Sequence, residues 1–418
     1  MRLLISLSAH HRWNIYHLDV KSAFLNGVLE EEVYVQQPEG FLVKGQEDKV
    51  YHLKKALYGL KQAPRAWNAR IDGYLHQNGF IKCPYEHAIY MKRNHRGEFL
   101  IICLYVDDLL YTGSSTEMLA EFKAAMFNKF EMTDNGLMSY FLGIEVKQHQ
   151  EGIFISQKKY MKEILEKFKM NECNPVNTPV AIGMKLSREG DGCFVDSTLF
   201  KSLVGSLRYL TITRPDFTYG VGLVSRYMET PNESHWLAAK RILRYIKGTL
   251  NLGLFYAYDE NAQLVGYSDS DWGGDQDERK STTGYVFYLG STAFSWTSKK
   301  QGVVALSSCE AEYVAAASTV CEAIWLRNIL NELDHPQEDS TIIFVDNKSA
   351  IQLAKNPVHH GRSKHIDTQF HFLRDHVKQK IVELKHCHTT EQVVDIFTKP
   401  LSGETFTRLR DMLGLKTF

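Results

Sequence analysis

The chain has 418 residues, with 49 Lys plus Arg against 49 Asp plus Glu, 44% apolar residues, 10 Pro and 28 Gly. This composition is that of an ordinary globular protein, and the length predicts two or three domains, each with its own core. Disorder, collagen and coiled coil are excluded as the main character of the chain. Because the net charge is zero, any surface that binds a polyanion is expected to be a local patch balanced by acids elsewhere.

The cysteines and the apolar runs indicate a soluble intracellular protein. Seven Cys residues are scattered without a C-x-x-C pair, which is typical of reduced thiols. The first residues, MRLLISLSAHHRW, have an apolar core at the short limit for a signal peptide, so secretion is not expected. The strongest apolar run, residues 99–111, is too short to span a bilayer and carries two Asp, so no membrane partner is expected.

The first half of the chain mixes short strands and turns and then becomes rich in predicted helix. Helical periodicity takes over after about residue 115, and the Pro- and Gly-containing stretch 174–196 predicts an exposed connector. The predicted elements are strands at 15–19 and 33–35, a helix at 67–78, two apolar runs folded about an acidic centre at 99–112, and helices at 118–130, 158–168, 200–210 and 236–246.

From about residue 264 the pattern changes to strands followed by helices. The order of three strands, helix, strand, helix, strand, helix predicts a compact α/β layout with mixed strand pairing. The predicted elements are strands at 264–268, 283–288 and 293–298, a helix at 310–333, a strand at 341–345, a helix from 347, a strand at 381–386 and a helix through 395.

Two predicted strand ends in the first half carry carboxylates. Asp107 and Asp108 lie where the two apolar runs meet, and Asp19 ends an earlier strand. Taken singly, a solvated hairpin turn and a helix N-cap are sufficient explanations. Taken together, strand-end carboxylates that face one another across a sheet suit two Mg²⁺ ions about 3.5 to 4 Å apart, which stabilise the attacking and leaving oxygens in phosphoryl transfer.

Several long motifs around these acids resemble the reverse transcriptase of Ty1/copia-type LTR retrotransposons. They occur in the family's order, and the resemblance continues to the C-terminus. The motifs are HLDVKSAFLNG (17–27), YVQQPEGF (34–41), ALYGLKQAPRAW (56–67), LYVDDLLYTG (104–113) and YFLGIEV (140–146).

The resemblance implies a polymerase palm that acts on an RNA template with dNTPs. Asp19, Asp107 and Asp108 then match the carboxylates that hold the catalytic metals. The resemblance also implies substrate contacts: Phe24 lies under the incoming sugar and excludes a 2′-hydroxyl, Gln62 touches the nucleotide, and Phe141, Leu142 and Gly143 form the turn that grips the primer end. A core position is the alternative for Phe24.

The chain departs from the family pattern before Asp19. Only 18 residues precede this Asp, where the family carries a fingers region with basic residues that bind the triphosphate. We therefore expect an N-terminally truncated right hand that extends primers poorly.

The second half resembles the ribonuclease H of the same family. Glu312 lies in the first turns of a helix that a Ser307/Glu310 capping box begins, and the other acids lie at strand ends or on the last helix. The resemblance implies a catalytic tetrad of Asp269, Glu312, Asp346 and Asp395 that holds two Mg²⁺, with Mn²⁺ able to substitute, and cleaves RNA in RNA/DNA hybrids. Asp271 and Glu310 are the competing neighbours. The motifs are GYSDSDWGGD (266–275), KSTTGYVF (280–287), SKKQGVVALSSCEAEYVAAA (298–317), FVDNKSAI (344–351), SKHIDTQFHFLRD (363–375) and VVDIFTKPL (393–401).

Two further features leave alternatives open. The predicted helix 236–246 is basic and suits either contact with a hybrid duplex or a solvated outer face. A group of histidines near Cys387 suggests zinc, although no second Cys lies at ligand spacing; these are His359, His360, His365, His371 and His376.

The sequence therefore predicts an α/β and α+β multidomain fold and a fragment of a retrotransposon Pol polyprotein. The expected domains are palm and thumb at 1–172, a connector at 173–262 and a ribonuclease H-like mixed-sheet domain at 263–418. Expected partners also include the upstream integrase and protease segments and Gag particles. Expected locations are the cytoplasm, within a virus-like particle, and the nucleus. The alternative is a catalytically inactive or domesticated remnant that only binds nucleic acid or a partner.

Overall fold

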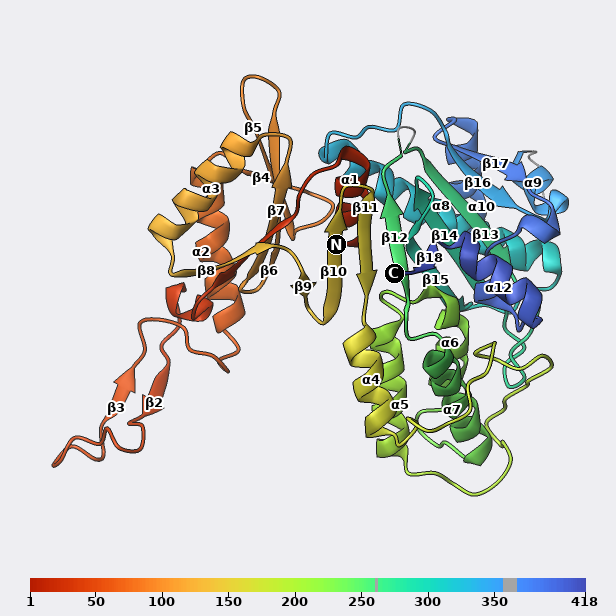
Figure 1. Cartoon of the computed structure of the whole chain (residues 1–418), viewed down its shortest axis with the longest axis horizontal. Coiled ribbons are helices and arrows are strands. Elements are labelled where there is room, and N and C mark those ends of the chain that lie inside the picture. The colour runs from red at the N-terminus through yellow and green to blue at the C-terminus, as the bar shows by residue number, and fades with distance from the viewer. Residues whose placement is uncertain (260–261, 356–366) are drawn as a thin grey trace. The chain divides into compact units, whose positions relative to one another are not determined.

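The computed structural model describes residues 1–259, 262–355 and 367–418, and the fold is a mixed α/β multidomain architecture (Figure 1). The chain forms two compact units. The small unit is Trp13–Met138, and the large unit combines Met1–Arg12 with Ser139–Phe418. The domain boundaries predicted after residues 172 and 262 stay predictions.

The small unit is a six-stranded antiparallel sheet with two helices. Its apolar core contains the sheet residues Leu18 and Ile102 together with Trp67 of α2 and Phe122 of α3. The strand order is β4-β5-β6-β7-β1-β8. The elements are β1 (Tyr16–Val20), β4 (Ile81–Lys82), β5 (Ile89–Arg93), β6 (Phe99–Tyr105), β7 (Asp108–Gly113), β8 (Met132–Leu137), α2 (Ala63–Gln77), α3 (Thr116–Lys129) and the separate hairpin of β2 (Tyr34–Gln36) and β3 (Val50–His52).

One antiparallel sheet of the large unit joins segments from three parts of the sequence. Its order is β18-β12-β11-β10-β9, and α1 packs against β11 and β12 through the buried Leu4, Ile5 and Leu7. Four helices lie between β11 and β12 in the sequence. The elements are α1 (Arg2–His11), β9 (Tyr140–Phe141), β10 (Ile144–His149), β11 (Gly152–Ser156), β12 (Leu252–Ala257), β18 (Leu415–Thr417), α4 (Lys158–Lys167), α5 (Ser197–Leu210), α6 (Thr218–Ser225) and α7 (Glu233–Gly248).

The second sheet of the large unit has the mixed pairing that the sequence predicts. Its order is β15-β14-β13-β16-β17, antiparallel through β13 and parallel from β13 to β17, and α8 packs against β13, β14 and β16 (Figure 1). The elements are β13 (Leu264–Ser270), β14 (Thr282–Leu289), β15 (Ala293–Lys300), α8 (Ser308–Glu332), β16 (Thr341–Val345), α9 (Lys348–Lys355), α10 (Asp367–Lys378), β17 (Val382–His386), α11 (Asp395–Thr398) and α12 (Gly403–Met412).

Most predicted elements are confirmed, and one stretch differs. The region after residue 115 was predicted to be rich in helix, whereas four strands, β8 to β11, lie between α3 and α4. These strands are short, and two of them pair with strands distant in sequence, β8 with β1 and β11 with β12, while β10 pairs with its neighbours β9 and β11. Their stability therefore depends on tertiary pairing, which helical periodicity in the flanking segments does not report.

The described residues form no helix with the length and apolar character needed to cross a bilayer.

A buried ion pair fixes the helices of the large unit. Arg214 is 0% exposed and donates from Nε to Asp216 Oδ1 at 3.0 Å and from Nη2 to Asp216 Oδ2 at 2.8 Å. It also donates to the Thr249 carbonyl oxygen at 3.1 Å, at the end of α7. Tyr245 donates its hydroxyl hydrogen to Asp216 Oδ2 at 2.5 Å. Each charged group is therefore compensated, and the segment after α5 is held to α7.

Replacing Asp216 with Ala leaves the Arg214 guanidinium buried and unpaired. We expect the free energy of unfolding to fall by about 3 to 5 kcal/mol, measured by urea denaturation of the whole chain. The double variant Arg214→Met/Asp216→Leu removes both charges and is expected to lose much less. Equal losses in the single and double variants would show that packing, and not the charge pair, is what matters here.

Candidate active sites

The three acids predicted in the small unit lie at one end of β1 and β7. Asp19 is the register partner of Asp108 in the antiparallel pair of these strands. Asp107 lies in the two-residue turn between β6 and β7, where Tyr105 pairs with Asp108. The sheet therefore brings together residues 88 positions apart, counted from Asp19 to Asp107.

The turn that carries Asp107 is fixed by hydrogen bonds on both sides. Val106 has φ 55°, a left-handed conformation that is strained for a β-branched residue. Trp67 donates its indole N–H to the Val106 carbonyl oxygen at 2.6 Å, and the Val20 amide donates to the Asp107 carbonyl oxygen at 2.9 Å. The surrounding structure thus holds an unfavourable turn in place, which is common at functional sites.

His17 is a residue of this site that the sequence analysis missed. Its Nε2 lies 2.7 Å from Asp108 Oδ1, and Asn135 Nδ2 lies 3.3 Å from its Nδ1. His17 and Asp19 are two positions apart on β1 and therefore share one face of the sheet, which is the sequence signal that points to this residue.

Burial is the main cause that raises the pKa of Asp19, and the nearby Asp107 and Asp108 raise it further. In the described chain, these three acids do not form a group whose ligand oxygens all lie within 4.8 Å of one another. The three predicted acids therefore lie together at one end of the sheet. Their carboxylate oxygens are more widely spaced than those of Asp269, Asp346 and Asp395 in the large unit.

The predicted substrate contacts fall in both units. Phe24 is half-buried against the core of the small unit, and its ring centroid lies 6.0 Å from that of Tyr58, so it has both core and surface character. Gln62 is the N-cap residue of α2, but its side chain makes no capping hydrogen bond.

The predicted primer-contacting turn belongs to the large unit. Phe141 is buried, and Leu142 and Gly143 form the tight turn between β9 and β10 with φ 45° and 78°. Tyr209 donates its hydroxyl hydrogen to the Leu142 carbonyl oxygen. A Cβ at Gly143 would collide with this hydroxyl, so the position requires glycine for space as well as for φ.

In the large unit, the acids predicted for ribonuclease H converge. Asp269 lies on β13, Asp346 directly follows β16, and Asp395 begins α11. Their ligand oxygens lie within 4.8 Å of one another. Glu312 of α8 is also buried and lies close enough to hydrogen-bond with Asp269. Four elements therefore contribute one acid each to a single buried cluster.

Glycine at position 284 makes this convergence possible. Gly284 is the register partner of Asp269 on the neighbouring strand β14. A Cβ on Gly284 would lie 2.7 Å from Val394 Cγ1 and 2.9 Å from Thr398 Cγ2. Because there is no side chain at this point, α11 packs directly on the sheet and places Asp395 beside Asp269.

The structure also distinguishes the four acids from their competing neighbours. Asp271 accepts a hydrogen bond from the Thr282 amide, and Glu310 accepts one from the Leu306 amide at 3.1 Å. These two carboxylates thus support a turn and the start of α8. The capping box prediction is correct for Ser307, which accepts from the Glu310 amide, but the Glu310 carboxylate bonds to the residue before the cap.

Like charges in a buried space raise the pKa values of this cluster. Burial, followed by the charges of Asp269 and Asp346, raises the pKa of Glu312 far above its ordinary value. Burial and Asp269 raise the pKa of Asp395 to about 7 and also raise that of Asp346. The cluster therefore resists full ionisation unless positive charge is present.

Lys399 supplies part of that positive charge and was missed by the sequence analysis. Its Nζ lies 2.8 Å from Asp395 Oδ1, four residues earlier in the chain. Although burial lowers the pKa of Lys399, Asp269 and Asp395 raise it by more. The i, i+4 spacing of an acid and a lysine is the signal that identifies this pair in the sequence.

The donor set fits a hard divalent cation. All four groups are carboxylates, and Mg²⁺ prefers oxygen ligands. Glu312 Oε2 is buried and has no hydrogen-bond partner among the described residues. Such an atom is costly to bury unless a cation or water completes it. Asp269, Glu312, Asp346 and Asp395 are thus the residues that would hold the metal.

The basic helix is explained by local contacts. Arg241 of α7 donates to Thr178 Oγ1 at 3.0 Å, Arg244 donates to the Asn174 carbonyl oxygen at 2.7 Å, and Lys247 donates to the Asn171 carbonyl oxygen. Three of its basic side chains thus hold the connector that precedes α5. The suggested zinc ligands His359, His360 and His365 lie outside the described residues.

Comparisons with known proteins place the chain among retrotransposon proteins. A family model described as reverse transcriptase (RNA-dependent DNA polymerase) matches residues 1–182. The retrovirus-related Pol polyprotein from transposon RE2 of Arabidopsis thaliana is 40% identical over 99% of this chain. The putative transposon Ty5-1 protein of Saccharomyces cerevisiae is 35% identical over 73% of this chain and 100% of its own length.

Two solved structures also match. A foamy viral protease-reverse transcriptase in complex with dsDNA is 14% identical, covers 90% of this chain and 68% of its own, and has a TM-score of 0.47. An N-terminal RNase H domain from Mycobacterium tuberculosis is 13% identical, covers 36% of this chain and 97% of its own, and has a TM-score of 0.26.

A reverse transcriptase segment followed by a mixed-sheet unit with a buried cluster of acids is therefore the class of protein that the family match, the fold and the acid clusters define. Within that class, the chain belongs to the Ty1/copia-type retrotransposon Pol polyproteins. It spans 28% of the length of the RE2 polyprotein.

The raised pKa values predict how stability depends on pH without divalent metal. Since Asp395 binds its proton more tightly in the folded chain than in the unfolded chain, its contribution is complete below about pH 4 and is lost as pH rises through about 7. We expect the thermal midpoint of the large unit to fall over this range, and Mg²⁺ to reverse the fall. Asp395→Asn should flatten the dependence; an unchanged slope in this variant would contradict the assignment.

Proposed function

We propose that the acid cluster of the large unit cleaves the RNA strand of RNA/DNA hybrids with Mg²⁺. The observation that carries the proposal is the convergence of Asp269, Asp346 and Asp395 within 4.8 Å beside the buried Glu312. Burying this many acids is unfavourable unless a cation neutralises them, and nothing in the packing of the sheet requires charged groups there. The arrangement is therefore explained by chemistry better than by stability.

In this proposal each residue has a defined task. When bound, Mg²⁺ would supply an activated water and would neutralise charge that develops on the scissile phosphate. Asp269 and Asp346 provide oxygen ligands from adjacent strands of a rigid sheet. Asp395 and Glu312 complete the set from α11 and α8. Lys399 stabilises the ionised form of Asp395, which holds the carboxylate ready for metal.

Replacing Asp269 with Asn removes one negative ligand without changing the size of the side chain. We expect hybrid cleavage to fall about a hundredfold or more, because stabilisation of the transition state by metal is worth several kcal/mol. The measurement is release of labelled RNA fragments with 3′-hydroxyl ends from an RNA/DNA hybrid, at low salt with Mg²⁺ or Mn²⁺.

The matched control is Asp271→Asn, two positions along the same segment. Its amide oxygen still accepts a hydrogen bond from the Thr282 amide, so activity should be retained. If folded wild-type chain is inert on hybrid, or if only Asp271→Asn loses activity, the proposed tetrad fails. A chain that binds hybrid without cleaving it would support the alternative of a catalytically inactive, domesticated remnant.

We propose that the acids at the end of β1 and β7 serve RNA-directed DNA synthesis. The register pairing of Asp19 with Asp108 and the strained turn at Val106 support this role, together with membership in the family. Two Mg²⁺ would be held by Asp19, Asp107 and Asp108. In the same proposal, dNTP and primer contacts come from five residues: Phe24, Gln62, Phe141, Leu142 and Gly143.

Asp107→Asn removes a metal-binding charge from an exposed turn that does not need that charge to fold. In a Pol polypeptide that contains this segment, we expect Mg²⁺-dependent primer extension on an RNA template to fall by about a hundredfold or more, while affinity for primer-template duplex is retained. Substantial extension by the variant would remove Asp107 from the catalytic group. Loss of duplex binding would show instead that the substitution disturbs the fold.

The polyprotein context extends the proposed partners. This chain covers 28% of the length of the RE2 polyprotein. We propose integrase and protease segments of the same polyprotein, and Gag particles, as partners of the mature assembly. The proposed location is accordingly a cytoplasmic virus-like particle, followed by the nucleus.

A further inference from the structure

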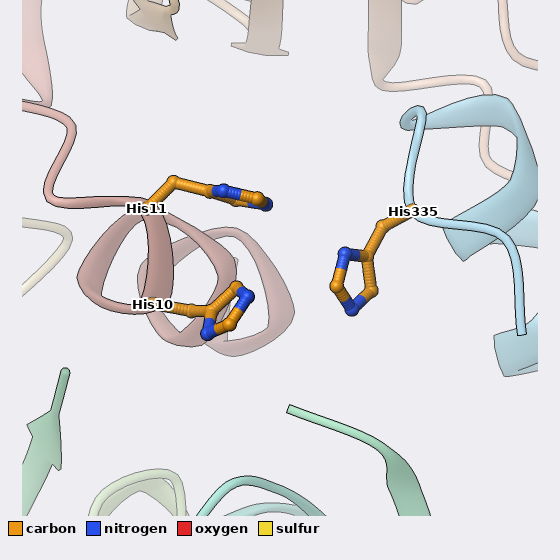
Figure 2. A group of neighbouring side chains, drawn as sticks. All are labelled: His10, His11 and His335. Carbon is orange, nitrogen blue, oxygen red and sulfur yellow. The ribbon is translucent and has the colours of Figure 1, made fainter. Parts of the chain in front are cut away.

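Three histidines gather in the large unit away from the acid cluster. His10 and His11 form the last turn of α1, and His335 follows the end of α8. The ring centroids lie 4.5 Å apart for His10 and His11, 5.3 Å for His10 and His335, and 5.5 Å for His11 and His335. Figure 2 shows the His335 ring turned toward the two rings of α1.

The three rings offer one nitrogen each within 4.8 Å of one another. A tetrahedral zinc ion with Zn–N distances of about 2.0 to 2.1 Å would need these nitrogens roughly 3.3 Å apart. Rotations about the side-chain bonds can supply that difference, and a fourth position stays open for water. His10 Nδ1 is buried and has no hydrogen-bond partner among the described residues. Burying this nitrogen is therefore unfavourable unless a metal ion or a water molecule binds it.

The backbone on both sides of the cluster is rigid. Arg12 ends α1 in the left-handed conformation, and its guanidinium stacks on the Tyr258 ring at 3.8 Å. Asp334, also left-handed, ends α8: its amide donates to the Asn331 carbonyl oxygen at 3.3 Å, and the His335 amide donates to that of Leu330 at 2.9 Å. This is the Schellman arrangement, which fixes where His335 leaves the helix.

The negative surroundings of the three histidines favour a bound cation. Two helix C-termini meet at the cluster, and each carries a partial negative charge. Asp259 and Asp334 add carboxylate charge near His10 and His11. Burial, followed by repulsion from the neighbouring histidines, lowers the pKa of His10 and lowers that of His11 to about 4.

One histidine also has the outer hydrogen bond that metal ligands usually have. His335 Nε2 lies 3.0 Å from the Ala262 carbonyl oxygen, which fixes the proton on Nε2 and leaves Nδ1 as the ligand atom. A cavity of about 320 Å³ borders His10 and His335 and gives solvent and ions access to the cluster.

We propose that His10, His11 and His335 form a zinc site that joins the end of α1 to the turn after α8. The ion would cross-link two segments that are 324 residues apart, counted from His11 to His335, within one compact unit. Zinc is the metal of choice because neutral imidazole suits it well, whereas Mg²⁺ prefers the carboxylates of the acid cluster. The site is thus independent of the proposed nuclease chemistry.

The test is zinc binding by the whole chain after chelator treatment, with Mg²⁺ in excess to occupy carboxylates. We expect calorimetry to show one zinc equivalent that His335→Gln and His11→Gln lose, and zinc to raise the thermal midpoint of the wild type by a few degrees. Cobalt in place of zinc should give the visible absorption of a tetrahedral site, and both variants should lose it.

Two controls separate this site from others. His149→Gln changes a histidine on β10, and Asp269→Asn changes the acid cluster; both are expected to keep the zinc equivalent and the stabilisation. His11→Gln lies at the exposed end of a helix, so it tests the proposal even if His335→Gln folds poorly. Equal zinc binding and equal stabilisation in wild type and His11→Gln would overturn the proposal, as would loss of the zinc equivalent in Asp269→Asn.

Discussion

Repulsion among buried carboxylates is the constraint on which the large unit depends. Asp269, Asp346 and Asp395 lie within 4.8 Å of one another, and Glu312 is buried beside them. Burial, followed by repulsion among these charges, raises the pKa values of Glu312 and Asp395. The fold keeps the acids together because they are fixed to four different elements whose packing has other sources. The positive charge of Lys399 reduces the repulsion among these carboxylates in part, and a bound divalent cation would reduce it further.

Buried hydrogen bonds next to the cluster hold together the elements that carry the acids. Helix α8 is held to β13 by Thr319, which donates its hydroxyl hydrogen to the Ala315 carbonyl oxygen and contacts Ser268 Oγ at 2.9 Å. Gln392 donates from Nε2 to the Ser268 carbonyl oxygen at 2.9 Å, which positions the segment before α11. These buried polar contacts pin the helices at fixed points on the sheet, so the carboxylates cannot separate without breaking them.

The cation sites proposed for this chain lie in two different kinds of negatively charged surroundings. At the acid clusters the charge resides on side chains, which suits a hard ion such as Mg²⁺. At the histidine cluster the negative charge comes from two helix ends and from neighbouring aspartates, while the ligands themselves are neutral. In the two proposals for the large unit, ligand chemistry alone separates the ion held by histidines from the ion held by carboxylates.

The sequence by itself determined the class of protein and most elements, and it selected the candidate acids. Strand-end positions and motif order were sufficient to select Asp19, Asp107, Asp108 and the four acids of the large unit, because alternation and capping are local properties of the chain. The strands β8 to β11 were missed: they are short, and β8 and β11 complete the sheets only with the distant strands β1 and β12. Only the tertiary structure showed what each carboxylate contacts: Asp269 and Glu312 lie in the buried cluster, whereas Asp271 and Glu310 accept hydrogen bonds from backbone amides. His17, Lys399 and the cluster of His10, His11 and His335 also emerged only there, since an interaction between side chains from separate elements depends on packing that no local pattern records.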